Sequence, residues 1–312
     1  MDRQVSAGTQ AASAEASPPG RASRWIAAPA GAALRPDVVL VYGSSSHGYL
    51  EPCGCGVKGE EMGGLARRAT LVDSLRGQSA PVLLVEVGDF VGGGGEPGHE
   101  IAEVSLEAMQ AMSYDVMALG DAELALGERF LDHAARSGIP VAHANWSHPA
   151  LGAQAEGLMI EKSGRKIGVV GILDPEALPQ DLPLENLTIG DPAAAAAAAA
   201  RSLREAGAEL ILVLGHADFR RSGRLAPAAG EPDLWIVGHG GKELSEPLPI
   251  DGVLLLGSGN MGKRAGVLEL DFDTAPGPRY ANLLYPLHET MPEQAAVAAI
   301  VKDRGAHASD GA

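Results

Sequence analysis

Short apolar segments, separated by stretches with helical spacing, most constrain how this chain folds. Four such segments are DVVLVYG (37–43), PVLLVEVGD (81–89), DVMALG (115–120) and PVAHAN (140–145). Their length and composition predict buried strands. Between them, residues 60–77, 100–113 and 127–137 have the apolar spacing of amphipathic helices. Strands and helices that alternate in this way predict βαβ units and a mainly parallel sheet.

The second half of the chain adds antiparallel features. LMIEKSGRKIGVVGI (158–172) predicts a hairpin with a Ser-Gly turn at 163–164. Two apolar runs, 209–215 and 233–238, predict further buried strands, and two more, 249–259 and 265–273, predict antiparallel ladder strands. The chain therefore combines parallel and antiparallel pairing in an α/β fold.

The two ends of the chain differ in composition from its centre. Residues 1–35 are rich in Ala, Ser, Gly and Pro, so we expect a disordered N-terminal segment there. We expect one domain over residues 36–290 and a C-terminal helix or tail over 291–312. No apolar run has the length of a secretory signal or of a membrane span, so the sequence predicts neither a signal peptide nor an integral membrane segment.

The charge balance limits the classes of partner. The chain carries 40 acidic and 24 basic residues, a formal net charge of −16. Nucleic acids and anionic membrane surfaces attract clustered Lys and Arg, so this balance argues against both. A small anionic substrate would need local positive charge, such as that of a metal ion.

Ligand-type side chains follow the ends of five predicted strands. Carboxyl ends of parallel strands meet at one edge of a sheet, which is where α/β proteins bind ligands. Imidazole and carboxylate groups together suit Mn, Zn, Fe or Ni. The sequence therefore predicts a divalent metal site at this edge. Its candidate ligands are His47, Asp89, Asp121, His216 and His239.

The order and spacing of these motifs resemble the calcineurin-like metallophosphoesterases, in their 5′-nucleotidase/UDP-sugar hydrolase branch. That family shows D-x-H-G, G-G-x-A-R, G-D-F, G-N-H-E, a lone His and then G-H-x-H or G-H-x-Q. The corresponding motifs here are SSHG (45–48), GGLAR (63–67), GDFVGG (88–93), GDAELALG (120–127), LGHAD (214–218) and GHGG (238–241). The resemblance implies a four-layer α/β/β/α sandwich of two mixed sheets. It also implies one or two divalent ions, and hydrolysis of a small phosphate ester in nucleotide catabolism.

Several motif positions depart from the family pattern. One family metal position uses the D-x-H pair and the last residue of G-H-x-H/Q, but Ser45 and Gly241 stand at two of those places. The other position uses the bridging Asp, the Asn of G-N-H-E and two His. Here Asp89, His216 and His239 match it, and Asp121 replaces the Asn. The family's catalytic His follows that Asn, and this chain has Ala122 there. The resemblance thus implies a partly degenerate two-metal site.

The two cysteines, Cys53 and Cys55, lie close after His47 in EPCGCG. They resemble a bacterial branch of the family with a Cys-Gly-Cys signature and, in some members, selenocysteine. A thiolate near a metal or a helix N-terminus acts as ligand or nucleophile, so both are candidate catalytic residues. They could equally be small thiols without a chemical role.

Three functions remain open on the sequence. The first is a metal-dependent phosphoesterase. The second is a thiol or sulfur-linked redox protein that uses Cys53 and Cys55 on this scaffold. The third is a non-catalytic metal-binding accessory protein, which the loss of the catalytic His at Ala122 favours. The family resemblance suggests a periplasmic or exported protein. It also suggests that the family's C-terminal nucleotide-specificity domain is absent.

Overall fold

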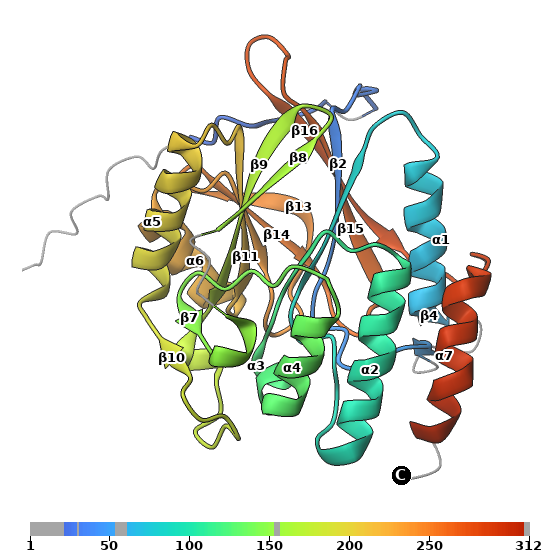
Figure 1. Ribbon diagram of the computed structural model, residues 1–312. Coiled ribbons are helices and arrows are strands. Elements are labelled where there is room, and N and C mark those ends of the chain that lie inside the picture. Colours follow the sequence, from blue (N-terminus) through green and yellow to red (C-terminus); the bar gives the residue numbers. More distant parts are fainter. Residues whose placement is uncertain (1–21, 30, 54–60, 153–156, 309–312) are drawn as a thin grey trace, which may run out of the picture.

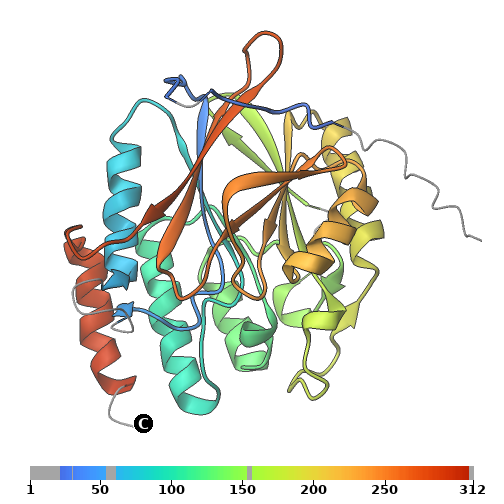
Figure 2. The same cartoon turned by 180° about the vertical axis from the view of Figure 1, so that it is seen from behind.

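Two six-stranded mixed sheets pack face to face, and helices cover their outer faces (Figure 1; Figure 2 shows the reverse side). The computed structural model describes residues 22–29, 31–53, 61–152 and 157–308. The first sheet has the order β1 (Ile26–Ala27), β16 (Arg279–Pro286), β15 (Arg264–Asp271), β2 (Val38–Gly43), β5 (Val82–Val87) and β6 (Val116–Ala118). The second has the order β13 (Glu243–Ile250), β14 (Val253–Ser258), β12 (Leu234–Val237), β11 (Leu210–His216), β9 (Arg165–Leu173) and β8 (Leu158–Lys162).

The apolar residues of each strand alternate between two cores, because successive side chains point to opposite faces of a sheet. In β2, Leu40 belongs to the core between the sheets, whereas Val39 and Val41 belong to the core under the outer helices. The helices of the first sheet are α1 (Leu65–Arg76), α2 (Gly95–Ala111), α4 (Glu128–Arg136) and α7 (Ala295–Ala308). Those of the second sheet are α5 (Pro192–Glu205) and α6 (Phe219–Ala229). The four-layer sandwich expected from the family resemblance is confirmed.

Parallel pairing sets the position of the strand ends. Strands β2, β5 and β6 are parallel neighbours, and so are β9, β11, β12 and β14. The expected hairpin is also present, since β8 pairs antiparallel with β9. Short pairs flank the sheets: β3 (Pro52–Cys53) with β4 (Met62–Gly63), and β7 (Trp146–Ser147) with β10 (Thr188–Ile189). Across the residues that the structure describes, every helix is too short or too polar to traverse a lipid bilayer.

One strand prediction was wrong. Residues 140–145 do not form a strand, because the chain there crosses between the sheets. The amide of Ala142 donates to Met117 in the first sheet, and that of Ala144 donates to Gly171 in the second. Only Val141 makes an isolated bridge. The antiparallel ladder strands expected at 249–259 and 265–273 are confirmed, since β14 pairs antiparallel with β13, and β15 with β16 and β2.

The folded structure begins before residue 36, where we expected its start. Trp25 is buried and packs edge-on against Phe272, with ring centroids 5.0 Å apart. The next two residues form β1, which pairs parallel with β16. Arg24 forms an ion pair with Asp233 of the second sheet. The composition of this segment predicted disorder. It could not reveal the order, because Phe272 and Asp233, which contact Trp25 and Arg24, lie more than 200 residues away in the sequence.

We expect Trp25→Ala to lower the free energy of unfolding by about 3–5 kcal/mol, since it removes a large buried ring and leaves a cavity. Equilibrium urea denaturation measures this change. Ile26→Ala is the matched control, because the Ile26 side chain is 39% exposed and its loss should cost much less. Equal, small effects of both substitutions would show that this segment does not contribute to the fold.

Candidate metal centre

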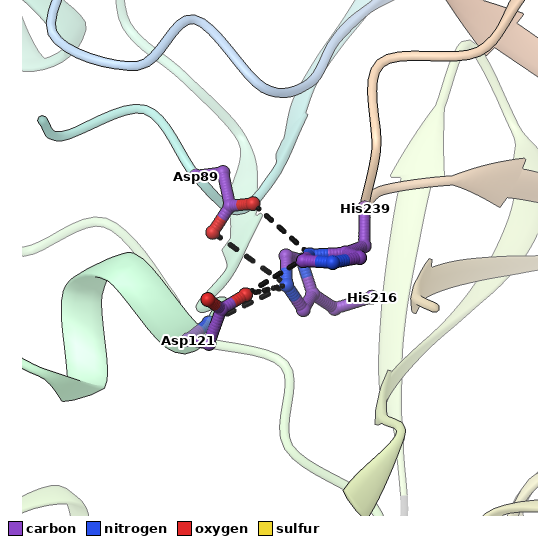
Figure 3. A group of neighbouring side chains, drawn as sticks. All are labelled: Asp89, Asp121, His216 and His239. Carbon is purple, nitrogen blue, oxygen red and sulfur yellow. Dashed lines mark hydrogen bonds and ion pairs between the residues drawn. The ribbon is translucent and has the colours of Figure 1, made fainter. Parts of the chain in front are cut away.

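Four side chains converge at the carboxyl ends of both sheets: Asp89, Asp121, His216 and His239 (Figure 3). One potential ligand atom from each lies within 4.8 Å of the others. His216 Nε2 is 2.8 Å from Asp121 Oδ1 and 3.5 Å from Asp89 Oδ1. His239 Nδ1 is 3.0 Å from Asp121 Oδ1 and 3.3 Å from Asp89 Oδ2. The structure therefore brings together four of the five metal ligands predicted from the sequence.

Each ligand is positioned by the end of a strand. Asp89 follows β5, and its φ of 53° turns the chain away from the sheet. Asp121 follows β6 and begins the short helix α3 (Asp121–Leu124). His216 is the last residue of β11, and His239 comes two residues after β12. Each sheet thus contributes two ligands to one point between them.

Glycines allow this close approach. A Cβ atom on Gly120 would lie 2.3 Å from His216 Cε1 and 2.6 Å from Asp89 Oδ1. One on Gly88 would lie 2.8 Å from His216 Nδ1, and Gly88 also has a φ of 80°. These distances are all shorter than van der Waals contact. No larger residue therefore fits at position 88 or 120 unless His216 moves.

Glu123 holds two ligand-bearing loops together. Its carboxylate is fully buried and accepts hydrogen bonds from the amides of Asp89, Phe90, Val91 and Gly120, at 2.7–3.0 Å. Burial and the neighbouring Asp89 carboxylate raise its pKa to about 7, although the amide donors act in the opposite direction. The sequence places Glu123 at a strand end, but we assigned no role to it. Glu123 matches the Glu of the family's G-N-H-E motif, which was the available signal, but three of its four amide donors lie 32–34 residues away, so its role could not be derived locally.

The two imidazoles present nitrogen atoms toward the carboxylates. His216 is fully buried and its Nδ1 lies 3.3 Å from the carbonyl oxygen of Val87, which leaves Nε2 to face the cluster. A backbone partner of this kind fixes the tautomer of a metal-binding histidine. Burial lowers the pKa of His216, but the effect of Asp89 and Asp121 is opposite and larger, so the pKa is raised overall. Asp121 and Asp89 also raise the pKa of His239, to about 10.

The arrangement fits a divalent cation. His239 Nδ1 is buried and makes no hydrogen bond, although two carboxylate oxygens lie within 3.3 Å of it. A polar atom buried without a hydrogen bond is costly, and a cation between the four groups would satisfy this nitrogen when it is neutral. Two carboxylates and two imidazoles are a ligand set that proteins use for Zn, Mn, Fe or Ni.

The remaining predicted site residues lie apart from this cluster or outside the described chain. The side chain of His47 is exposed and does not join the four-residue group. Cys53 ends strand β3, and Cys55 lies outside the described residues. The amide of Ala122 donates to Asp89 Oδ1 at 3.2 Å, so this residue touches the cluster through its backbone.

Comparison with known proteins points to nucleotidases. A 5′-nucleotidase of Diplobatis ommata is 28% identical over 248 residues, which cover 69% of this chain and 42% of that protein. The chain thus spans less than half the length of this relative. No protein-family model matches the sequence. The chain is thus similar in sequence to 5′-nucleotidases, and a 5′-nucleotidase of Rattus norvegicus is also 28% identical, over 76% of this chain and 46% of that protein.

Solved structures show the same fold. A 5′-nucleotidase precursor from Thermus thermophilus superposes with a TM-score of 0.76 and 24% identity, over 88% of this chain and 59% of its own. A sulfate thiohydrolase of the same species, SoxB in complex with glycerol, also has a TM-score of 0.76, with 16% identity over 89% of this chain and 62% of its own. The two mixed sheets therefore match the metallophosphoesterase fold of 5′-nucleotidases.

We expect the metal-free protein to lose stability as the pH rises from about 6.5 to 10. The pKa of His239 is higher in the folded protein than its ordinary value of 6.5. Its stabilising pairing with Asp121 and Asp89 is therefore complete below pH 6.5 and disappears as the imidazole loses its proton near pH 10. Urea denaturation of chelator-treated protein across this range measures the trend.

Added zinc should reverse the trend, because a metal ion binds the neutral imidazole and competes with protons. His239→Gln is the control, since it removes one of the two titrating imidazoles and should weaken the pH dependence of the metal-free protein. A stability of the metal-free protein that increases over this range would contradict the proposed pairing.

Proposed function

We propose that this chain is a metal-dependent hydrolase of small phosphate esters, similar to the 5′-nucleotidases. The observation that carries the proposal is the convergence of Asp89, Asp121, His216 and His239 from both sheets. The sequence relatives named above support phosphoester chemistry. We further propose, from those relatives, that the protein acts outside the cytoplasm.

A divalent cation, such as Mn, Zn, Fe or Ni, would be held by these four residues. Bound there, it supplies Lewis-acid polarisation of a phosphoryl oxygen and orients the substrate. Its positive charge would also attract an anion to a protein with a net charge of −16. The carbonyl oxygen of Val87 would hold the His216 ligand in place, and Glu123 would hold the Asp89 loop through its amides.

Ala122 limits the expected rate of this hydrolase. In the resembling family a histidine at this position acts on the leaving group or the transition state. Ala122 has no titratable side chain, and its amide is already directed at Asp89. Loss of a general acid typically lowers the rate about 10²–10⁴-fold. We therefore propose a slow hydrolase, or one in which another group supplies the proton.

The cysteines carry the second candidate function, a thiol or sulfur-linked redox protein. Two observations favour it: the catalytic histidine is replaced by Ala122, and Cys53 and Cys55 follow His47 in the sequence. The third candidate is a metal-binding accessory protein without catalysis. Phosphoester hydrolysis that needs metal and survives Cys53→Ser with Cys55→Ser would favour the hydrolase over both. Loss of all activity in that variant would favour the cysteine chemistry.

Asp89→Ala should abolish metal binding and hydrolysis, because Asp89 contacts both imidazoles of the cluster. The assay is release of phosphate from nucleoside monophosphates and from a generic aryl phosphate, with Mn or Zn added after chelation. Asp181→Ala is the matched control, since Asp181 is exposed and remote in sequence from the cluster. Metal content unchanged in Asp89→Ala would remove the basis of the proposed site.

Ala122→His should raise kcat by about 10²-fold or more, because it places a general acid beside the cluster. Steady-state kinetics with the aryl phosphate measure this gain. Ala122→Asn is the control, since an amide of similar reach cannot transfer a proton at neutral pH. A rate that stays at the level of the wild type in both variants would favour the accessory protein over the hydrolase.

A further inference from the structure

We propose that this centre takes one divalent cation per chain, and that the neighbouring position, where related two-metal enzymes hold a second ion, is closed. The inference rests on the proposed function, because it concerns the same ligands. Two-metal hydrolases place their ions about 3.5–4 Å apart, with a carboxylate shared between them. In the part of the chain that the structure describes, the candidate for sharing is Asp89, and the groups around it are arranged for one ion.

Both oxygens of Asp89 face the same four-residue cluster. Oδ1 lies 3.5 Å from His216 Nε2 and also accepts the amide of Ala122. Oδ2 lies 3.3 Å from His239 Nδ1. Since each oxygen is directed at an imidazole of the cluster, neither is turned toward a second position. Asp89 therefore serves as a ligand of one ion rather than as a bridge.

The residues on the other side of Asp89 offer no charged ligand. Ser45 is fully buried, and its hydroxyl donates a 2.8 Å hydrogen bond to the carbonyl of Gly238. Its backbone groups are also hydrogen-bonded. The amide of Ser45 donates to the carbonyl of Gly88, and its carbonyl accepts from the amide of Met261. His47 follows with an exposed side chain. Among residues 22–29, 31–53, 61–152 and 157–308, no second group of three or more ligating side chains occurs.

Gly241 closes the position from the second sheet. A Cβ atom on Gly241 would lie 2.5 Å from Asn260 Cβ, and its φ of 60° disfavours any side chain. Asn260 thus occupies the space into which a ligand at residue 241 would extend. The amide of Asn260 is neutral, so it does not replace the charge of a carboxylate or the affinity of an imidazole.

Charge also favours a single ion. Asp89 and Asp121 place two negative charges around one position, which balances one divalent cation when both imidazoles are neutral. A second cation would add two positive charges beside Asp89, and the neighbouring carboxylate of Glu123 is already engaged by four backbone amides. Repulsion between two such cations is large at the distance that a shared carboxylate imposes.

The test is the number of metal ions per chain, measured by elemental analysis of protein purified without chelator and by calorimetric titration of stripped protein with Zn²⁺ and with Mn²⁺. We expect one ion per chain. Two ions per chain would overturn this inference and leave the proposed function intact. No bound ion by either method would overturn the proposed function itself.

Three variants show which residues hold the ion. His47→Asn and Cys53→Ser with Cys55→Ser should retain one ion, with affinity within about threefold of the wild type, since neither change replaces any of the four ligands. Asn is chosen at 47 because it tolerates the positive φ of that position. Asp121→Ala should lose the ion. A lower metal count in either of the first two variants would place a ligand at the position that we infer to be closed.

Discussion

Direct contact between the backbones of the two sheets, at their carboxyl ends, is the constraint on which the site depends. A Cβ atom on Gly238 would lie 2.4 Å from the carbonyl oxygen of Val87, so β12 and β5 approach more closely than side chains allow. Gly120 packs directly against the His216 ring, since a Cβ atom there would lie 2.3 Å from Cε1. Because the sheets meet there without intervening side chains, Asp89 and His239 reach one another from opposite layers. A bulkier residue at either glycine would separate the ligands before it affected the cores.

The loops that carry the ligands need a second constraint, since loops alone do not hold atoms to within a fraction of an ångström. Glu123 supplies it with one carboxylate and four amides, which join the loop after β5 to the start of α3. A buried carboxylate that satisfies four donors is costly to desolvate but fixes a unique loop geometry. The ligands Asp89 and Asp121 thus share a support that is not itself part of the metal set. Val87 provides the equivalent support for His216.

Local sequence patterns predicted much of the fold, because strand length and helical spacing are encoded over a few residues. The hairpin between β8 and β9 is confirmed, and so is the four-layer architecture, which the family resemblance rather than a local pattern implied. The errors have a common cause, which is dependence on distant partners. Residues 140–145 look like a strand, but their amides bond to Met117 and Gly171 in different sheets. Trp25 lies in a segment of low complexity and is buried by Phe272. Likewise, proximity to a strand end made His47 a candidate ligand, yet only the structure places its side chain in solvent.

The aspartate at position 121 lets protons and a divalent cation compete for the same centre. Without metal, the carboxylates of Asp89 and Asp121 raise the pKa values of the two imidazoles and so favour their protonated forms. A bound divalent cation requires neutral imidazoles and supplies positive charge in their place. Binding is then an exchange of protons for metal. An asparagine at 121 would leave the metal-free centre with one negative charge fewer and a weaker hold on its protons. The carboxylate therefore stabilises the metal-free fold and also favours a single bound ion.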